Sequence, residues 1–212
     1  MRVHAGTPLQ PLLDAGGAYT LGEGIWQGPF VLTRPVRLQG EAGTVLDAGG
    51  HGPVISVAED DLDVELVGLT LRNGHADGGA GVRLTGWSAV RMQGCAVLEC
   101  RAPGNTGGGV AALRGTLEIA GCSFLGNRAA AGSDLLATGV AEVRVTGGRF
   151  AGDIALREGA RVVLEGVTVD GVIDVRATTT RAPHLRHAGC TLGGGLRNDS
   201  QHPGIVVEDE DA

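Results

Sequence analysis

The stretch VRMQG (90–94) is one of seven short segments in which apolar and polar residues alternate and a glycine follows. The others are VRLQG (36–40), VELVG (64–68), LEIAG (117–121), VRVTG (143–147), VVLEG (162–166) and LRHAG (185–189). Successive glycines are separated by 28, 26, 27, 26, 19 and 23 residues. A period in the twenties with one alternating strand per repeat is typical of a β-solenoid. The sequence therefore predicts one all-β domain built as a right-handed parallel β-helix of about seven coils.

The alternation also predicts which side chains face the core. Apolar residues stand four and two positions before the glycines, as Val90 and Met92 do before Gly94, with His187 as the exception before Gly189. From the second coil onward, the apolar positions are also one and three residues after the glycine. A period of two places one face of each strand in a core. The change of phase at the glycine is expected where the chain bends and a side chain would clash. The coil is therefore expected to turn a corner at each of these glycines.

Charged residues alternate along the column three positions before each glycine. In chain order the column reads Arg37, Glu65, Arg91, Glu118, Arg144, Val163, Arg186. Stacked strands lie about 4.8 Å apart, so these residues are expected to be lateral neighbours on the outer face. We interpret the column as a structural charge ladder that helps to fix the register.

Composition excludes some classes of binding partner and indicates where in the cell the protein is located. The 212 residues include 38 glycines and carry a net charge of −7, which argues against nucleic acid and against an anionic membrane. No segment resembles a transmembrane span or a secretory signal, so a cytoplasmic location is expected. Three of the four cysteines follow a corner glycine and are expected in the core. Cys100 is the candidate for an accessible thiol.

Three zones are expected along the chain. Residues 1–30 form a cap and entry, in which TPLQPLLDA (7–15) is expected to make a short helix over the open end of the core. Residues 31–200 form the coils. Residues 201–212 add a terminal strand and an acidic tail, which we interpret as protection of the solenoid end.

The loops that follow the corners carry a resemblance to known families. FLGN (124–127) contains FxxN, and GGAGV (78–82) and GGGV (107–110) follow a GGA-apolar pattern. These repeats resemble those of chlamydial polymorphic outer-membrane proteins and, more widely, right-handed parallel β-helices of the pectate-lyase-like superfamily. The resemblance covers about residues 19–200. It implies the fold, and it leaves lyase, hydrolase, adhesin and scaffold functions open.

An enzyme of this superfamily is the alternative function. Polysaccharide lyases and glycoside hydrolases need clustered carboxylates, and the candidate cluster is Asp47 and His51 with His75 and Asp77. GHG (50–52) resembles a short polygalacturonase motif, but the accompanying motifs are missing, so no catalytic role is assigned. The acidic run EDDLDVE (59–65) lacks a calcium-loop spacing. We expect neither a metal nor a cofactor.

The favoured function is that of a non-catalytic, rigid scaffold. The longer coils place extra residues in three successive loops, 72–80, 99–108 and 126–132, and such loops stack on one side of a solenoid. The candidate binding ridge is His75, Asp77, Arg101, Asn105 and Arg128. A protein is the expected partner, a glycan is the alternative, and the solenoid ends offer surfaces for a homo-oligomer.

Overall fold

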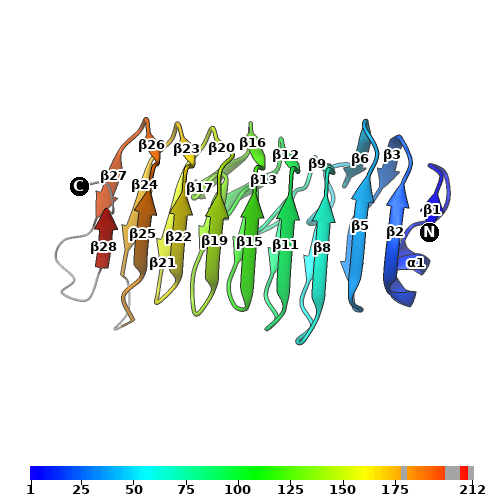
Figure 1. Ribbon diagram of the computed structural model, residues 1–212, viewed down its shortest axis with the longest axis horizontal. Coiled ribbons are helices and arrows are strands. Elements are labelled where there is room, and N and C mark those ends of the chain that lie inside the picture. The colour runs from blue at the N-terminus through cyan, green and yellow to red at the C-terminus, as the bar shows by residue number, and fades with distance from the viewer. Residues whose placement is uncertain (178–180, 199–205, 210–212) are drawn as a thin grey trace.

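Nearly every strand of this protein pairs in parallel with the strands one coil before and one coil after it (Figure 1). The computed structural model describes residues 1–177, 181–198 and 206–209. The strands of the first sheet run upward in front, and the chain returns behind them as it advances towards the C-terminal end. The protein is a right-handed parallel β-helix, as the sequence predicts.

Three long sheets form the walls of the solenoid, and consecutive strands of the chain visit them in turn. The first sheet contains β1 (Arg2–Val3), β2 (Gly17–Leu21), β5 (Val36–Gly40), β8 (Asp63–Val67), β11 (Ala89–Gln93), β15 (Thr116–Ala120), β19 (Glu142–Thr146), β22 (Arg161–Glu165), β25 (His184–Ala188) and β28 (Val206–Asp209). The second contains β3 (Gly24–Gln27), β6 (Thr44–Asp47), β9 (Thr70–Arg72), β12 (Ala96–Leu98), β16 (Ser123–Leu125), β20 (Arg149–Phe150), β23 (Thr168–Val169) and β26 (Thr191–Leu192).

The third sheet contains β4 (Phe30–Leu32), β7 (Ile55–Val57), β10 (Val82–Leu84), β14 (Val110–Ala112), β18 (Leu135–Ala137), β21 (Ile154–Arg157), β24 (Ile173–Arg176) and β27 (Leu196–Asn198). A separate pair, β13 (Arg101–Thr106) and β17 (Arg128–Ala131), lies outside these walls. The seven glycine-marked corners are all present. One further coil, β2 to β4, comes before them, so part of the predicted entry zone, residues 1–30, is already solenoid.

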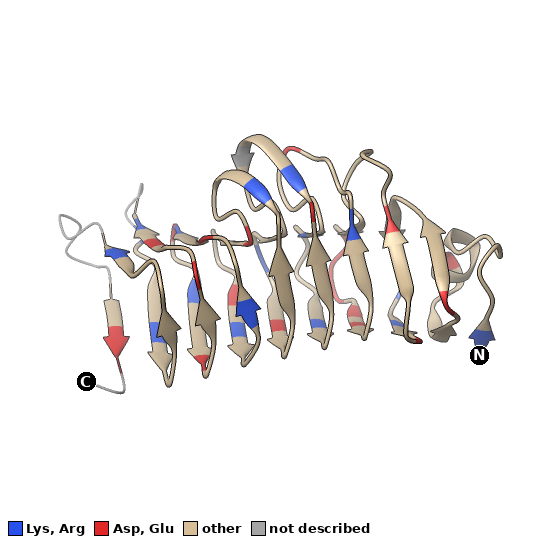
Figure 2. Cartoon of the chain, turned by 90° about the horizontal axis from the view of Figure 1, so that it is seen from above, with Lys and Arg blue, Asp and Glu red and all other residues tan. Residues whose placement is uncertain are grey.

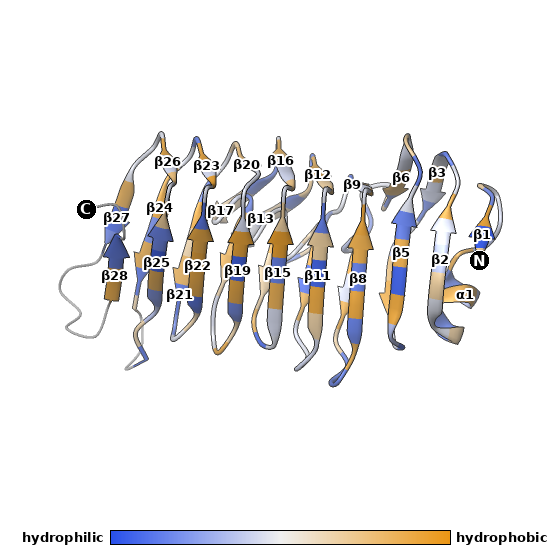
Figure 3. Cartoon of the chain, viewed as in Figure 1, coloured by the Kyte–Doolittle hydropathy of each residue, from blue (hydrophilic) through white to orange (hydrophobic). Residues whose placement is uncertain are grey.

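The core runs through the solenoid as one continuous apolar cluster from Val3 to Leu185. Figure 3 shows apolar and polar bands alternating along the strands of the first sheet. The predicted inward pair of β11, Val90 and Met92, is buried, while Arg91 between them is half-exposed. The predicted inward register is therefore confirmed.

The corner glycines are required for their backbone angle more than for space. Gly94 has φ of 58°, and a Cβ placed there would meet no atom within 4 Å. A positive φ strains any residue with a side chain, because its Cβ approaches the backbone. Only at Gly40 would a side chain strike neighbouring backbone, the oxygen of Gly68 at 2.8 Å. The steric clash expected at every corner is thus mostly absent.

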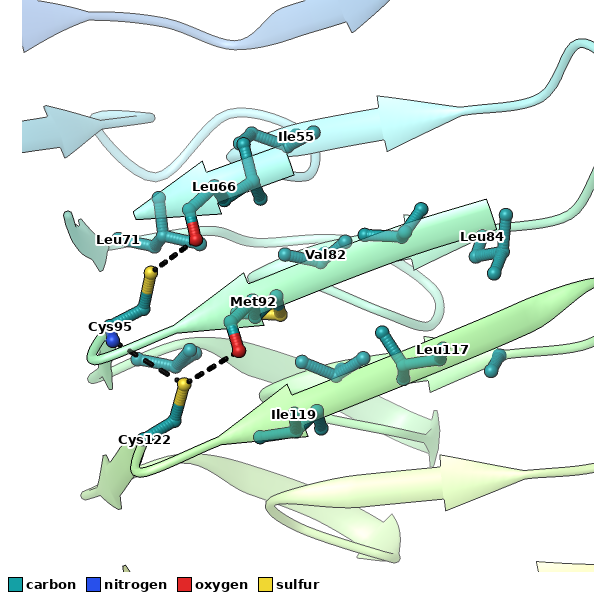
Figure 4. Packing of buried hydrophobic residues seen from close by; sticks show 14 of the residues in the cluster. Ile55, Leu66, Leu71, Val82, Leu84, Met92, Cys95, Leu117, Ile119 and Cys122 are labelled. Carbon is teal, nitrogen blue, oxygen red and sulfur yellow. Dashed lines mark hydrogen bonds between the residues drawn. The ribbon is translucent and has the colours of Figure 1, made fainter. Parts of the chain in front are cut away.

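Of the three cysteines predicted in the core, Cys95 and Cys122 are buried there, and Cys190 is partly buried against it. Cys95 and Cys122 stand on neighbouring coils, and the N–H of Cys95 donates to the sulfur of Cys122 across 3.3 Å (Figure 4). The interpretation of Cys100 is wrong, because its side chain is fully buried and burial raises the pKa of its thiol to about 11.

The residues of the charge ladder do lie in one column, but neighbours in the column do not all form ion pairs with each other. Arg37 and Glu65 are in register and form an ion pair of 2.8 Å. Arg91 and Arg144 flank Glu118 in register, yet each binds another carboxylate at a strand end, that of Asp63 or Glu165. Long arginine side chains can reach diagonally, so the partner is not fixed by the column alone.

The first end of the solenoid is covered by the predicted cap. Helix α1 (Gln10–Ala15) lies within TPLQPLLDA, and Leu9 and Leu13 bury their side chains against the core. At the other end β28 pairs with β25 at the predicted terminal strand. The predicted acidic tail reaches residues 210–212, which lie outside the described residues. In the described part of the chain, no helix has the length and apolar character needed to cross a bilayer.

Candidate functional site

The three predicted loops project from the corner between the second and third sheets. Two of them contain the strands β13 and β17, which form a small parallel sheet with Arg101 opposite Arg128. Figure 2 shows the two loops arching beyond the walls of the solenoid, with a basic residue on each. We call this projection, with the adjoining loop at residues 72–80, the loop ridge.

A second, smaller apolar cluster holds the ridge against the solenoid. Ala111, Leu136 and Ala155 lie next to one another on the outward side of the third sheet, where polar residues are usual, and all three are buried. Ala131 of β17 packs against them. Gly132 has φ of 59°, and a Cβ there would lie 2.4 Å from the oxygen of Leu135, so the loop needs glycine to approach this closely.

The asparagine of FxxN anchors the ridge from inside. The Asn127 side chain is buried, and its Oδ1 accepts the N–H of Cys100 at 3.0 Å. Its Nδ2 donates to the oxygen of Val97 at 3.0 Å and to Oδ1 of Asp134 at 2.9 Å. The carboxylate of Asp134 also accepts the N–H of Gly152 on the next coil. The Asn127 amide and the Asp134 carboxylate together thus join three successive coils at the base of the loop ridge.

Three of the five predicted binding residues stand in one column on the ridge. Backbone bridges pair His75 with Arg101, and strand pairing continues from Arg101 to Arg128. All three side chains are exposed. Within the described parts of the chain, neither Arg101 nor Arg128 forms an ion pair. We call Arg101 and Arg128 the cationic column, and His75 stands next to it in the same register.

The other two predicted binding residues lie further along the same loops. Asp77 is exposed, and the bridge between Gly78 and Thr106 places it level with Asn105 of the neighbouring loop. Asn105 lies in β13. All five residues therefore come from neighbouring loops. What they bind stays a prediction.

The four residues of the enzyme alternative are only partly brought together. Asp47 and His75 line one groove of about 540 Å³, together with Gln27, Asn73, Glu99 and Arg101. His51 and Asp77 are exposed and do not line this groove. The described residues contain no group of three His, Cys, Asp or Glu side chains placed to hold a metal ion.

Asp47 is the most constrained carboxylate in the groove. It accepts hydrogen bonds from Nε of Arg72 at 2.7 Å, from the N–H of Gly49 at 2.8 Å and from Nδ2 of Asn73 at 3.0 and 3.1 Å. Burial raises the pKa of the Asp47 carboxyl, but the bonds from Gly49, Arg72 and Asn73 outweigh burial and hold the pKa below its usual value. The group stays charged with its oxygens occupied, which suits a structural anion better than a general acid.

The pKa of the Asp134 carboxyl is shifted in the opposite direction, above its usual value. Burial raises the pKa of its carboxyl, and the bonds from Asn127 and Gly152 offset this only in part. The free-energy cost of ionising Asp134 therefore appears as the pH rises from its unfolded pKa towards its folded pKa. The ionised carboxylate of Asp47 stabilises the fold, and this has the opposite pH dependence. The stabilisation is present above the unfolded pKa and is lost as the pH falls through the depressed folded pKa.

We therefore expect Asp47→Asn and Asp134→Asn to show opposite pH trends. The stability lead of the wild type over Asp47→Asn should shrink as the pH falls below about 4, the ordinary aspartate value. Its lead over Asp134→Asn should instead shrink as the pH rises above about 4. Urea unfolding across an acidic pH series measures both differences. Parallel trends for the two variants would contradict the assigned environments.

Sequence reasoning missed the residues that hold Asp47. Arg72 is paired with Asp47 in register on the next coil, and Asn73 follows with φ of 57°. The signal was present, because LDA (46–48) and LRN (71–73) occupy equivalent positions after their corners. Glu99, which follows the corner on the third of these coils, was also missed. Comparing outward positions between coils would have found these side chains.

Comparison with known proteins gives one partial match. A protein of Pseudomonas aeruginosa described as "Probable ABC transporter binding protein NosD" is 41% identical to this chain over 68 residues, which are 32% of this chain and 15% of that protein. No family model matches the chain. No solved structure matches it. The comparisons thus add a partial likeness to a binding protein, and the matched part is a small share of that protein's length.

Proposed function

We propose that this protein is a non-catalytic, rigid β-helix scaffold that binds a protein partner through its loop ridge. The observation that carries the proposal is the cationic column, in which strand register stacks Arg101 and Arg128 as exposed neighbours, with His75 beside Arg101. Like charges on adjacent strands repel, so the column has a cost that an acidic partner would relieve. The chain as a whole carries a net charge of −7, and the exposed Glu99 lines the same groove as Arg101, so the basic character is confined to the two arginines of the column.

Two further observations support a binding role. The loop ridge rests on a rigid frame of paired strands and is held by the Asn127 network, so its side chains are presented without a large ordering cost. The partly matching protein of Pseudomonas aeruginosa is described as a binding protein. A glycan partner, the resemblance to pectate-lyase-like proteins and a cytoplasmic location remain predictions from the sequence.

Reversing the two arginines is expected to abolish partner capture. The double variant Arg101→Glu with Arg128→Glu should recover little of any protein that the wild type enriches from a lysate of the source organism. Its melting temperature should stay nearly unchanged, because exposed charges contribute little to stability. Quantitative mass spectrometry of the captured proteins measures the loss.

A matched variant distinguishes an effect of the ridge arginines on partner capture from an effect of the protein's net charge. Arg161→Glu with Arg197→Glu changes the total charge equally at two exposed residues away from the ridge. It should capture the partner as the wild type does. Equal loss in both double variants would mean that overall charge, and not the ridge, governs binding, and the proposal would be wrong.

A further inference from the structure

The outer edge of β17 has no neighbouring strand among the described residues. β17 pairs with β13 and belongs to no larger sheet. The next coil has no comparable loop, because only residues 151–153 separate β20 from β21. The shortened step of 19 residues between Gly147 and Gly166 therefore ends the ridge at β17.

The free edge presents backbone groups that can pair. Arg128 donates its N–H to the oxygen of Cys100 at 2.8 Å, on the β13 side. Since successive residues of a strand direct their N–H and C=O groups to opposite edges, those of Ala129 face away from β13. The amide of Ala129 is thus placed for a hydrogen bond with an added strand.

Apart from the charge of Arg128, the sequence of β17 carries none of the usual protections of an exposed edge. Natural proteins block exposed edges with proline, lysine, bulges or inward charges. β17 reads RAAA, and its three alanines leave room for another backbone to approach. The N-terminal end of the solenoid is by contrast covered by α1 and β1. An open edge beside exposed arginines is suited to strand addition.

The charges beside the free edge of β17 favour the binding of a strand with acidic side chains. Arg128 is exposed on β17 itself, and Arg101 lies one strand further in, with no ion pair for either among the described residues. A strand added to β17 would place alternate side chains on the same face as Arg128. Acidic side chains at those positions would find two guanidinium groups within reach.

We propose that an extended, acidic peptide segment of the partner binds by adding as a strand to the free edge of β17. The proposal rests on the proposed scaffold function and names how the ridge would recognise its partner. Backbone hydrogen bonds at Ala129 provide the pairing, and the cationic column provides the preference for acidic side chains.

Peptides with blocked amides test this directly. The probe is a short, end-capped, fluorescent peptide in which Glu alternates with Val, long enough to cover the four residues of β17. Two further peptides carry N-methyl groups on the Glu amides or on the Val amides. An added strand pairs with β17 through one of its edges, and only every second amide of the peptide points to that edge. The peptide methylated on those amides should therefore bind at least tenfold more weakly, and the other methylated peptide should bind as the parent does. Equal binding by both, or no binding of the parent, would overturn strand addition.

Two variants of Ala129 provide the protein side of the test. Ala129→Pro removes the outward N–H and keeps every charge, and proline is tolerated at strand edges. It should weaken binding of the parent peptide at least tenfold, whereas Ala129→Ser keeps the N–H and should bind normally. Circular dichroism and melting curves check that both variants fold. Unchanged binding by a folded Ala129→Pro would overturn the proposal.

The two proposals fail separately. If the peptide does not bind, but Arg101→Glu with Arg128→Glu still loses the captured protein, the scaffold function stands and only strand addition is wrong. If the peptide binds as expected and the double variant captures the same proteins as the wild type, the ridge accepts acidic strands but is not the site of the captured partner.

Discussion

Phe124→Ala is expected to lower the free energy of unfolding by about 3–5 kcal/mol, as large-to-small changes in packed cores do. Phe124 is 2% exposed and stacks on Phe150 of the next coil, with ring centroids 4.3 Å apart and planes 12° apart. Truncation removes this contact and leaves a cavity that the in-register strands β16 and β20 cannot close without breaking their pairing. Urea unfolding followed by circular dichroism measures the loss.

The neighbouring residue provides the matched control. Leu125 lies on the same strand, and its side chain is 61% exposed because it points to the opposite face. Leu125→Ala should change the free energy of unfolding by less than about 0.5 kcal/mol. Similar losses at the two positions would mean that β16 is not held in the inward register described above.

The solenoid walls were predictable because their physical signal repeats. One alternating strand in each repeat, such as Val90 with Met92 or Val143 with Val145, can bury one face in only one register. The coil formed by β2, β3 and β4 was harder to detect. Its first strand reads GAYTL (17–21), which has little of the apolar alternation that marks the later coils.

The loop ridge was predictable only in outline. Coil length indicated which loops are long, but not that they contain β13 and β17, since RAPGNT (101–106) and RAAA (128–131) show no alternation of apolar residues. Their pairing depends on support from other coils, including the packing of Ala131 against the cluster that contains Ala111 and Ala155. A pattern within one loop cannot reveal such support.

The charged groups of the candidate site illustrate the same limit. The predicted cluster of Asp47, His51, His75 and Asp77 was based on equivalent loop positions, yet only Asp47 and His75 line a common groove. Asp47 is instead held by Arg72 of the next coil. Register pairs Asp47 with Arg72 because both are strand residues, whereas His51, His75 and Asp77 lie outside the named strands, where register does not fix the direction of a side chain.

Asn127→Ala is expected to cost about 2–3 kcal/mol, because it removes a hydrogen bond from three buried groups, although the carboxylate of Asp134 keeps another partner, the N–H of Gly152. These groups are the N–H of Cys100, the oxygen of Val97 and the carboxylate of Asp134. Since Asn127 stands at the base of the ridge, hydrogen exchange should accelerate more at the amide of Arg128 than at that of Val143 in the first sheet.

Asn198→Ala is the control for Asn127→Ala, because Asn198 is exposed in β27 and its loss should leave stability and exchange nearly unchanged. A wild-type exchange rate at Arg128 in the Asn127→Ala variant would show that the ridge holds its shape without this network. The network then could not be what presents the cationic column. If exchange does accelerate, partner capture should weaken although no charge has changed, because a mobile ridge must be ordered again on binding.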